Sequence, residues 1–577
     1  MLDRKNSAGL MITLGHNSSA VFYDGTQKPI GYEEERLNGI KSSSAFPQKS
    51  IEEIIRNVEA AKLQGAKIFV SHWFDTFEPR YFPGKYYDYD YMHLLMNRYD
   101  MKLVLLSREF THHDAHAYSS LAFLENRTNA GVEIETNTHF VVADGFGNEK
   151  EVISVYKLSE QKPGELDLVS RIHGYERSLG LLYQYATSFC GMKETQDEYK
   201  FLGYESKIEE NVSLEGIQLL KHESYRITDY IWTSMGGATP KTEATKHLDS
   251  AALLGVKLSY HNEFAKIIER LKEIEVVEQP TSGFIRSSIG FVIQSCVENI
   301  MSKVISAYDI ENVVLSGGCF YNVKLNNHVL TRVKGQVCVL PLAGDQGAAI
   351  GMYRKYIGAF DFSDLCFGKR KLSKKVNINF TSPVKFVDSE EEFIQTVVEL
   401  IDKNHIVNVM HGDMEFGPRA LCNTSTLALP TAKNVAYINH INRRNTVMPM
   451  APVILNKYVE CVFDKSENVS RVLASNEYMV MTHDICEDVS LSEKYQGIIH
   501  KYPLEARYSG RPQIVRDRST IIGKILDKAN SMCLINTSFN THGTPILFSV
   551  YDAVWDFTKQ RALDYERLAH LVILTND

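Results

Sequence analysis

The sequence lacks a long hydrophobic run, because no stretch reaches the ~20 apolar residues that a membrane-spanning helix needs. The N-terminal stretch has only a short apolar run, interrupted by glycine and histidine, so we expect no secretory signal peptide there. The nine cysteines include no Cys-x-x-Cys pair, and an odd number cannot all form internal disulfides. These absences predict a cytoplasmic protein with reduced thiols, no zinc knuckle and no membrane partner.

The chain also has no large excess of charge of one sign. Its formal net charge is -8 over 577 residues, so we expect no global attraction to nucleic acid or anionic membranes, although a local basic patch is compatible with that total. Hydrophobic residues make up 44% and charged residues 23%, which is ordinary for globular proteins and enough for large buried cores. The length predicts two or three domains.

What the sequence does contain is the pattern of an α/β protein. Short apolar runs at 66–72, 101–107 and 137–148 end in polar residues, as strands do when their C-terminal ends line a cleft. Residues 288–309 are amphipathic with helical spacing and lead into a further predicted strand.

The composition changes at residues 361–383, which are basic and polar and have no clear period. We therefore predict an N-terminal domain over residues 1–362, a linker over 363–383 and a second α/β domain over 384–577.

A stretch rich in histidine is the first candidate site. His112 and His116 are four residues apart, so on a helix they project from one face about one turn, ~5.4 Å, from each other. Asp144 and Asp345 each follow a predicted strand beside a glycine-rich turn, where a carboxylate can reach a metal ion. The four residues predict a site for iron, manganese or zinc rather than calcium. The alternative is that the histidines lie on a helix surface or cap the helix.

Two glycine-rich turns form a second constellation. Gly317 and Gly318 in one, and Gly344 and Gly347 in the other, lie between a predicted strand and a predicted helix. Such turns let backbone N–H groups approach a phosphate at a helix N-terminus. Neither matches a Walker A or dinucleotide fingerprint, and the alternative is that they only turn the chain.

Polar loops of the second region carry Arg419, Arg444 and Arg511, and Asn536 and Ser538 lie nearby in sequence. Guanidinium groups pair bidentately with oxyanions, and the amide and hydroxyl add neutral donors. We interpret these residues as an anion-binding site. The alternative is ordinary surface arginine.

From about Gly9 to the C-terminus the chain resembles the O-carbamoyltransferases, the group that includes nodulation-factor, cephalosporin and aminoglycoside carbamoylating enzymes. Eleven motifs in the family's order carry the resemblance. They are GHNSSA, EEERLNGIK, HHDAHAYSS, DGFGN, RSLGLLYQYAT, DEYKFLG, SGGCFYN, AGDQGAAIG, MEFGPRALCNTS, PMAPVIL and INTSFNTHGTPI.

The resemblance implies a fold of two parts. The N-terminal part is expected to be an actin/hexokinase-like (ASKHA) domain, similar to that of the tRNA threonylcarbamoyl transferase. The C-terminal part is expected to be a YrdC-like α/β domain. In the family, this second domain joins ATP and carbamoyl phosphate into carbamoyl adenylate, releasing phosphate and pyrophosphate. The first domain then transfers the carbamoyl group to a hydroxyl and leaves AMP.

The resemblance also assigns residues by position. The implied metal set is His112, His116, Asp144 and Asp345. Nucleotide-contacting positions are Lys200, Gly317, Gly318 and Asn322. The adenylate-forming site matches Arg419, Arg444, Arg511, Asn536 and Ser538. The catalytic positions beside the acceptor match His16 and Lys41. The implied cofactors are magnesium with ATP and a divalent metal, with iron(II) favoured and manganese or zinc as alternatives.

These assignments agree with the chemistry. An acyl adenylate is a mixed anhydride, so AMP is a good leaving group and a metal ion can act as Lewis acid. Histidine side chains can accept a proton at neutral pH, so His16 suits a general base, and Lys41 can stabilise charge developing on the carbamoyl oxygen. Because water would hydrolyse the adenylate, we expect a shielded internal path between the two sites.

The chain departs from the family near the expected carbamoyl phosphate pocket. Asn442 stands where lysine is usual, and Met448 stands where the family has the arginine of Phe-Arg-Pro-Phe-Ala-Pro. Arg443 is a candidate replacement for the lost charge. Smaller departures are Asn17, Thr424 and Thr544, which stand where aspartate, arginine and glutamate are usual. Either the anion site is rebuilt or the donor step is weakened.

The acceptor is left open. Residues 78–100 mix many tyrosines with charges, and such rings can stack on a planar acceptor; the alternative is that they pack over the domain. A sugar or antibiotic-like hydroxyl and a hydroxymethyl pyrimidine nucleotide or DNA remain candidates, with nucleic acid not favoured by the net charge. A threonylcarbamoyl-type transferase acting on tRNA, a nucleotide-binding regulator without donor chemistry, and a homodimer stay open as well.

Overall fold

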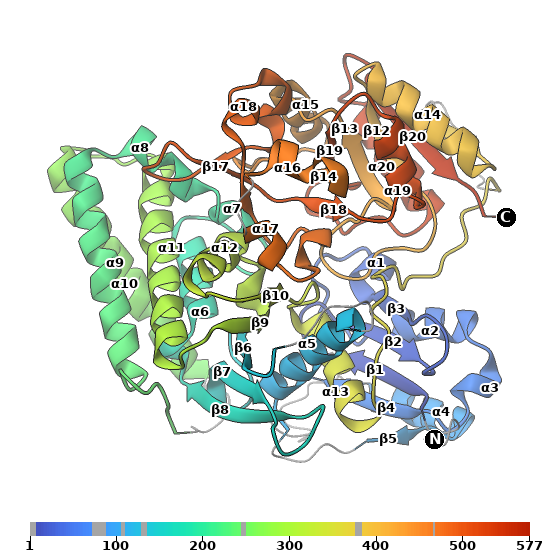
Figure 1. Ribbon diagram of the computed structural model, residues 1–577, viewed down its shortest axis with the longest axis horizontal. Helices are drawn as coiled ribbons and strands as arrows, with labels where there is room; N and C mark the ends of the chain where they lie inside the picture. Colours follow the sequence, from blue (N-terminus) through green and yellow to red (C-terminus); the bar gives the residue numbers. More distant parts are fainter. Residues whose placement is uncertain are drawn as a thin grey trace.

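Four sheets form the framework of the part of the chain that the structure describes. Figure 1 shows the C-terminal part, in orange and red, lying across the blue and the green halves of the N-terminal part. The computed structural model describes residues 7–71, 88–104, 110–128, 135–243, 250–375, 384–464 and 468–576.

The first sheet has the strand order β3-β2-β1-β4-β5. β1 pairs antiparallel with β2 and parallel with β4. All five residues of β1 are buried, as expected for an apolar central strand with elements on both faces. The strands are β3 (Ile30–Glu33), β2 (Ser19–Tyr23), β1 (Gly9–Thr13), β4 (Lys67–Ser71) and β5 (Lys102–Leu103).

The second sheet repeats the first. Its central strand, β6 (Thr138–Ala143), pairs antiparallel with β7 (Glu151–Leu158) and parallel with β9 (Asn312–Ser316). β8 (Leu166–His173) and β10 (Val337–Val339) are its edges. Taken in chain order, both sheets place their third, second, first, fourth and fifth strands side by side. This duplication is the arrangement of an actin/hexokinase-like domain, and it confirms the predicted fold of the N-terminal part.

Two helices cross between the repeated sheets. α5 (His112–Thr128) packs against β6 and β9, and α13 (Ala348–Tyr356) packs against β1 and β4. The two helices also pack on each other, and Gly351 permits the approach, because a Cβ there would overlap the carbonyl oxygen of Ala115. The histidine stretch therefore begins a helix that is buried at the centre of the N-terminal part.

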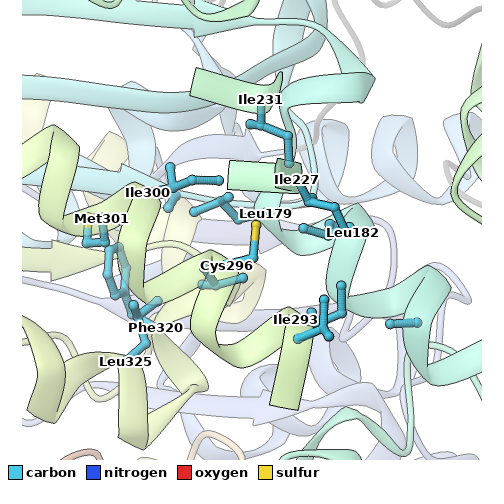
Figure 2. Close-up of a cluster of buried hydrophobic side chains, with 14 of the residues drawn as sticks. Leu179, Leu182, Ile227, Ile231, Ile293, Cys296, Ile300, Met301, Phe320 and Leu325 are labelled. Atoms are coloured by element: carbon cyan, nitrogen blue, oxygen red, sulfur yellow. The ribbon is translucent and has the colours of Figure 1, made fainter. Parts of the chain in front are cut away.

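A layer of helices covers the outer face of the second sheet (Figure 1). It contains α6 (Leu179–Phe189), α9 (Leu214–Ser234), α10 (Ser250–Glu275), α11 (Ser282–Ala307) and α12 (Val323–Arg332). Figure 2 shows its core, in which Ile227 and Ile231 of α9 and Cys296 and Ile300 of α11 face Leu179 of α6. This core fixes α6 and α12, whose N-termini lie beside the strand ends of the second sheet.

The C-terminal part is built on a seven-stranded mixed sheet in the order β11-β20-β12-β13-β19-β14-β18. The strands are β11 (Val384–Val387), β20 (Ala569–Leu574), β12 (Ile406–Met410), β13 (Thr424–Ala428), β19 (Cys533–Ser538), β14 (Ala451–Leu455) and β18 (Gln513–Val515). Its longer helices are α14 (Glu390–Asp402), α15 (Ala432–Ile441), α19 (Ile521–Lys528) and α20 (Val550–Arg561). The mixed α/β class predicted for this part is confirmed.

A three-stranded antiparallel sheet completes the C-terminal part. It consists of β15 (His483–Asp484), β17 (Tyr508–Gly510) and β16 (His500–Lys501). Together with the neighbouring loops it lies against the helical layer of the N-terminal part: Asn326 of α12 donates a 2.7 Å hydrogen bond to the carbonyl of Val480.

The described part of the predicted linker, residues 363–375, is packed in its middle and exposed at its lysines. Phe367 is 1% exposed, and its carbonyl accepts a 3.0 Å hydrogen bond from the backbone of Gly31. Arg370 is also buried and donates to the carbonyls of Gly412 and His411 at 2.9 and 3.0 Å. Phe367 and Arg370 therefore anchor this part of the connection to both parts of the molecule. The exact domain limits stay a prediction.

Within the described residues, no helix combines the length and the apolar character that crossing a membrane requires. The nine cysteines form no disulfide with one another.

Candidate active site and metal centre

The N-terminus of α5 is fixed by three side chains that accept its free backbone N–H groups. The N–H groups of His112 and His113 donate to Asn148 Oδ1 at 2.6 Å and Glu151 Oε1 at 2.9 Å. Asp114 Oδ2 accepts from the backbone of Thr111 at 2.7 Å. Because capping groups satisfy N–H groups that have no partner within the helix, the first turn and its imidazoles are held in one orientation.

His112, His116, Asp144 and Asp345 converge at this helix end. One donor atom from each residue lies within 4.8 Å of all the others. The Nε2 atoms of the two histidines are 3.1 Å apart, and the His112 Nε2 atom is 3.2 Å from Asp144 Oδ2 and 3.3 Å from Asp345 Oδ1. The structure thus brings together the four residues whose spacing predicted a metal site.

The histidines are buried rather than superficial. His112 is 3% and His116 is 0% exposed, so the alternative of a surface position is wrong. Burial alone would lower the pKa of His112, but Asp345 and Asp144 outweigh burial and raise this pKa to about 10. The pKa of Asp144 lies well below its usual value despite burial, because both histidines donate to it. The carboxylates are therefore charged at neutral pH.

This donor set fits a transition-metal ion. Two imidazole nitrogens and two carboxylate oxygens are the ligands that iron, manganese and zinc accept. The Nε2 atoms point at each other and at the carboxylates, whereas the Nδ1 atoms of both histidines have no hydrogen-bond partner among the described residues. A cation between the four donors would satisfy all of them.

The glycine turn after β9 supports the same carboxylate. Asp144 Oδ1 accepts from the backbone N–H of Gly145 at 2.7 Å and of Gly318 at 3.3 Å. Gly317 has φ 94°, and a Cβ there would overlap the carbonyl oxygen of Ala143. These glycines thus allow two strand ends to meet at Asp144, and a nucleotide contact at Gly317 and Gly318 stays a prediction.

A second buried layer behind the histidines was not predicted. Arg171 Nη2 donates to Asp114 Oδ1 at 2.7 Å, and Arg171 Nε lies 3.2 Å from Glu151 Oε2. Tyr156 donates to Asp114 at 2.8 Å. Asp114 lies within the histidine stretch itself, but Arg171 and Tyr156 carry no motif signal, because only strand pairing brings them to the helix.

His16 lies beside this centre, whereas Lys41 lies near Arg444 and Lys200. His16 Nδ1 is 3.5 Å from Asp345 Oδ2, and the side chain of His16 is 53% exposed. Burial lowers the pKa of Lys41 although Glu35 opposes it, and Arg444 and Lys200 lower it further. A histidine that reaches both solvent and a metal-site carboxylate can exchange a proton with a bound hydroxyl.

Lys200, at the C-terminal end of α7 (Glu198–Phe201), lies where the two parts of the molecule meet. Its ammonium is 2.7 Å from Asp197 Oδ1 and 2.9 Å from the Nε2 atom of His542, a residue of the C-terminal part. The side chain of Asn322 caps α12 by accepting from the backbone of Leu325 at 2.9 Å. The structure brings Lys200 close to Lys41, whereas Asn322 holds a helix end.

Three arginines of the C-terminal part have no carboxylate partner among the described residues. Arg444 Nη2 donates to Ser538 Oγ at 3.1 Å and to Asn540 Oδ1 at 3.0 Å. The pKa of Arg511 lies well below its usual value because of burial and the nearby charge of Arg419. Guanidinium groups remain charged in proteins, so two adjacent half-buried cations favour a bound anion here.

Asn536 has a different environment. It is 2% exposed, and its amide donates to the carbonyl of Ala420 at 2.8 Å and to Gln513 Oε1 at 2.6 Å. The first bond joins β19 to the loop that carries Arg419, and the second joins it to β18. A direct contact between Asn536 and a ligand stays a prediction.

The two main departures from the family have structural explanations. Asn442 is fully buried, and its Oδ1 accepts from Gln560 at 2.6 Å. Met448 packs against Gly203, where a Cβ would lie 2.6 Å from its sulfur. Arg443 is exposed. The lost cations are thus replaced by a buried polar contact and by an interface contact.

The first part of the tyrosine-rich stretch 78–100 lies outside the described residues. Its second part is α4 (Tyr89–Tyr99), which buries Met92, Leu95 and Tyr99. Tyr99 is buried and Tyr91 packs partly against the same core, whereas Tyr89 is exposed. The alternative of packing over the domain therefore holds for two of these tyrosines.

The comparisons with known proteins show the family of the chain. The family model described as carbamoyltransferase N-terminus matches residues 8–353, and the one described as carbamoyltransferase C-terminus matches 398–574. The chain belongs to the carbamoyltransferase family, which confirms the predicted family and enzyme class.

The similar proteins are distant relatives. An uncharacterized protein of Methanocaldococcus jannaschii is 26% identical, and the match spans 94% of this chain and 95% of that protein. The nodulation protein NolNO of Sinorhizobium fredii is 23% identical, and the match spans 96% of this chain and 78% of NolNO. Among solved structures, HypF of T. kodakarensis is 12% identical with a TM-score of 0.28, and the match spans 60% of this chain and 47% of HypF.

Proposed function

We propose that the protein is an ATP-dependent O-carbamoyltransferase that forms carbamoyl adenylate in its C-terminal part and uses it in its N-terminal part. The proposal rests on the family and on two sites, one of which suits a cation and the other anions. One is the cluster of two imidazoles and two carboxylates. The other is the pair Arg419 and Arg511, which has no carboxylate partner among the described residues. The first site suits a cation and the second suits phosphates.

In the proposed first reaction, the arginines hold the phosphates of ATP and of carbamoyl phosphate. Because both phosphate and pyrophosphate are released, atom balance requires one water molecule: it opens carbamoyl phosphate to carbamate and phosphate. A carbamate oxygen then attacks the α-phosphorus of ATP, and the bond to the β-phosphate breaks with pyrophosphate as leaving group. Arg444, anchored on Ser538 and Asn540, is pre-oriented for such an anion, which lowers the cost of ordering it.

In the proposed second reaction, His16 accepts the proton of the acceptor hydroxyl as its oxygen attacks the carbamoyl carbon. The carbon–oxygen bond to the phosphate breaks, and AMP leaves with the electron pair. Lys41 stabilises the charge that develops on the carbamoyl oxygen. His112, His116, Asp144 and Asp345 would hold the metal ion, which when bound supplies Lewis acidity. Glu151, Asp114 and Arg171 keep the two imidazoles in place.

The observation that carries the proposal is the unpaired pair Arg419 and Arg511 in a member of this family. The test is to incubate the protein with ATP and to measure AMP and pyrophosphate with and without carbamoyl phosphate. We expect AMP formation that requires carbamoyl phosphate. Dependence on threonine and bicarbonate instead would favour a threonylcarbamoyl-type transferase.

A regulator without donor chemistry is the second candidate, because Asn442 and Met448 remove two cations that the family usually carries. This candidate predicts ATP binding without any turnover. The substitution Met448→Arg distinguishes the two, since it should restore turnover only if the lost charge limits the donor step.

The acceptor is proposed as a hydroxyl compound, either sugar-like or a hydroxymethyl pyrimidine. Its identification requires a screen in which candidate hydroxyl compounds are incubated with protein, ATP and carbamoyl phosphate. A mass gain of one carbamoyl group identifies the acceptor.

A further inference from the structure

A histidine of the C-terminal part reaches into the N-terminal part at the proposed nucleotide site. The Nε2 atom of His542 lies 2.9 Å from the Nζ atom of Lys200, 342 residues away in sequence. An ammonium group can only donate hydrogen bonds. The Nε2 atom is therefore the acceptor, and the imidazole is neutral with its proton on Nδ1.

The loop that presents His542 is firmly held. The backbone N–H of His542 donates to the carbonyl of Asn442 at 2.8 Å. Gly543 follows with φ 88°, and the N–H of Thr544 donates back to the carbonyl of Thr541 at 3.2 Å. Asn442 is itself fixed by its 2.6 Å bond from Gln560. The position of the imidazole is thus set by the C-terminal core rather than by Lys200.

The charges around His542 favour its neutral form. The side chains that act on it are the cations of Lys200, Lys41 and Arg444 and the carboxylate of Asp197. Burial lowers the pKa of His542, the three cations lower it further, and Asp197 opposes them. Both parts of the molecule therefore contribute cations to one region, and the imidazole lies among them without adding charge.

We propose that His542 is a positioning residue that holds the Lys200 ammonium toward the phosphate of a nucleotide bound where the two parts meet. The ammonium of Lys200 already pairs with one carboxylate, Asp197, at 2.7 Å. An acidic acceptor in place of His542 would add a second negative charge, and a basic one would repel the ammonium. A neutral acceptor orders the ammonium without cancelling more of its charge. This inference deepens the proposed function, on which it rests, by assigning a C-terminal residue to the N-terminal nucleotide site.

The test is a double-mutant cycle on the full-length protein, with AMP affinity measured by calorimetry. The variants are His542→Ala, Lys200→Ala and the two combined. We expect His542→Ala to weaken AMP binding about tenfold, which corresponds to the ~1.4 kcal/mol scale of one hydrogen bond to a charged group. The double variant should bind no more weakly than Lys200→Ala, since residues that act together are not additive.

Two further variants separate positioning from a loss of structure. His542→Gln keeps an acceptor and should bind AMP within about threefold of the unaltered protein, a difference below ~1 kcal/mol. His222→Ala removes a histidine that is 74% exposed on α9 and should change nothing. Additive effects of His542 and Lys200, a His542→Gln variant as weak as His542→Ala, or an unaltered protein that does not bind AMP would overturn the inference.

AMP binding does not require the donor reaction. If AMP affinity follows the expected cycle but carbamoyl phosphate gives no turnover, only the proposed function fails. If turnover occurs but the cycle is additive, only the role of His542 fails.

Discussion

At the scale of single residues, the candidate site gathers charges of one sign at each of two places. Asp144 and Asp345 share two buried imidazoles and have no lysine or arginine within ion-pair distance among the described residues. Arg419 and Arg511 likewise meet no carboxylate there. Burying such groups costs free energy unless they are compensated. Each set therefore indicates a ligand of opposite charge, a cation in the first case and phosphates in the second.

The metal site makes the first prediction. His112→Ala removes one of four ligands and should lower the affinity for iron(II), manganese or zinc by more than the ~10–100-fold typical of outer-shell changes. Metal content after dialysis, measured by mass spectrometry, checks this. The exposed His222→Ala serves as control and should retain the metal; equal metal content in both variants would contradict the assignment.

The anion site makes the second prediction. Arg511→Ala should reduce carbamoyl-phosphate-dependent pyrophosphate release about 10²-fold or more, because a pre-oriented cation at a transferring phosphate is lost. Arg507→Ala is the matched control, since Arg507 is half exposed and pairs on the surface with Asp484. Such pairs contribute little, and the control should keep its rate. Unchanged release in Arg511→Ala would rule out its role.

At the scale of elements, the crossing of α5 and α13 positions the two histidines of the proposed metal site. Gly351→Ala would place a methyl group on the carbonyl of Ala115 and should destabilise the protein by ~1–3 kcal/mol. It should also weaken metal binding, because α5 carries both histidines. Unfolding in urea and metal content measure the two effects.

The control for this crossing is another helical glycine. Gly255 lies on the exposed face of α10, and no atom lies within 4 Å of a Cβ added there. Gly255→Ala should therefore stabilise the protein by about 0.5–1 kcal/mol through helix propensity. Destabilisation of both variants to the same extent would mean that crowding at the crossing is not the cause.

α11 makes a prediction about pH. Burial raises the pKa of Glu298 from 4.5 to about 8, and Glu205 acts in the same direction. Above pH 4.5 the unfolded state loses the proton of Glu298, whereas the folded state keeps it up to about pH 8. Glu298 therefore lowers the free energy of unfolding progressively as pH rises from 4.5 to about 8. Glu298→Gln should flatten this part of the curve of unfolding free energy against pH. An identical slope in both proteins would contradict the assignment.

Sequence patterns predicted what depends on short-range geometry. Four-residue spacing placed His112 and His116 on one helix face, and the pattern placed Asp144 and Asp345 each at the end of a strand beside a glycine-rich turn. The structure brings the four together. The patterns did not predict the buried position of Asn442, because a polar residue in a loop gives no sign of a buried partner. The sequence patterns also did not predict the hydrogen bond between Lys200 and His542, since only the docking of the two parts brings these residues together.

At the scale of the whole molecule, the C-terminal part is docked on the N-terminal part by buried contacts near the sites. Arg36, 3% exposed at its side chain, pairs with Glu33 and donates to the carbonyl of Gly417 at 2.7 Å. Glu33 in turn accepts from the backbone of Gly417 at 3.1 Å. The motifs EEERLNGIK and MEFGPRAL thus meet at the interface. This docking supports the proposal that the adenylate passes internally between the two sites.

The division of labour between the parts is the central claim, and isotope exchange tests it without an acceptor. Labelled pyrophosphate enters ATP only if the adenylate forms reversibly, so the exchange that carbamoyl phosphate supports reports the C-terminal site alone. We predict that His112→Ala exchanges at the rate of the unaltered protein and that Arg511→Ala does not exchange. Loss of exchange in His112→Ala, in a variant that remains folded, would contradict the separation into two sites.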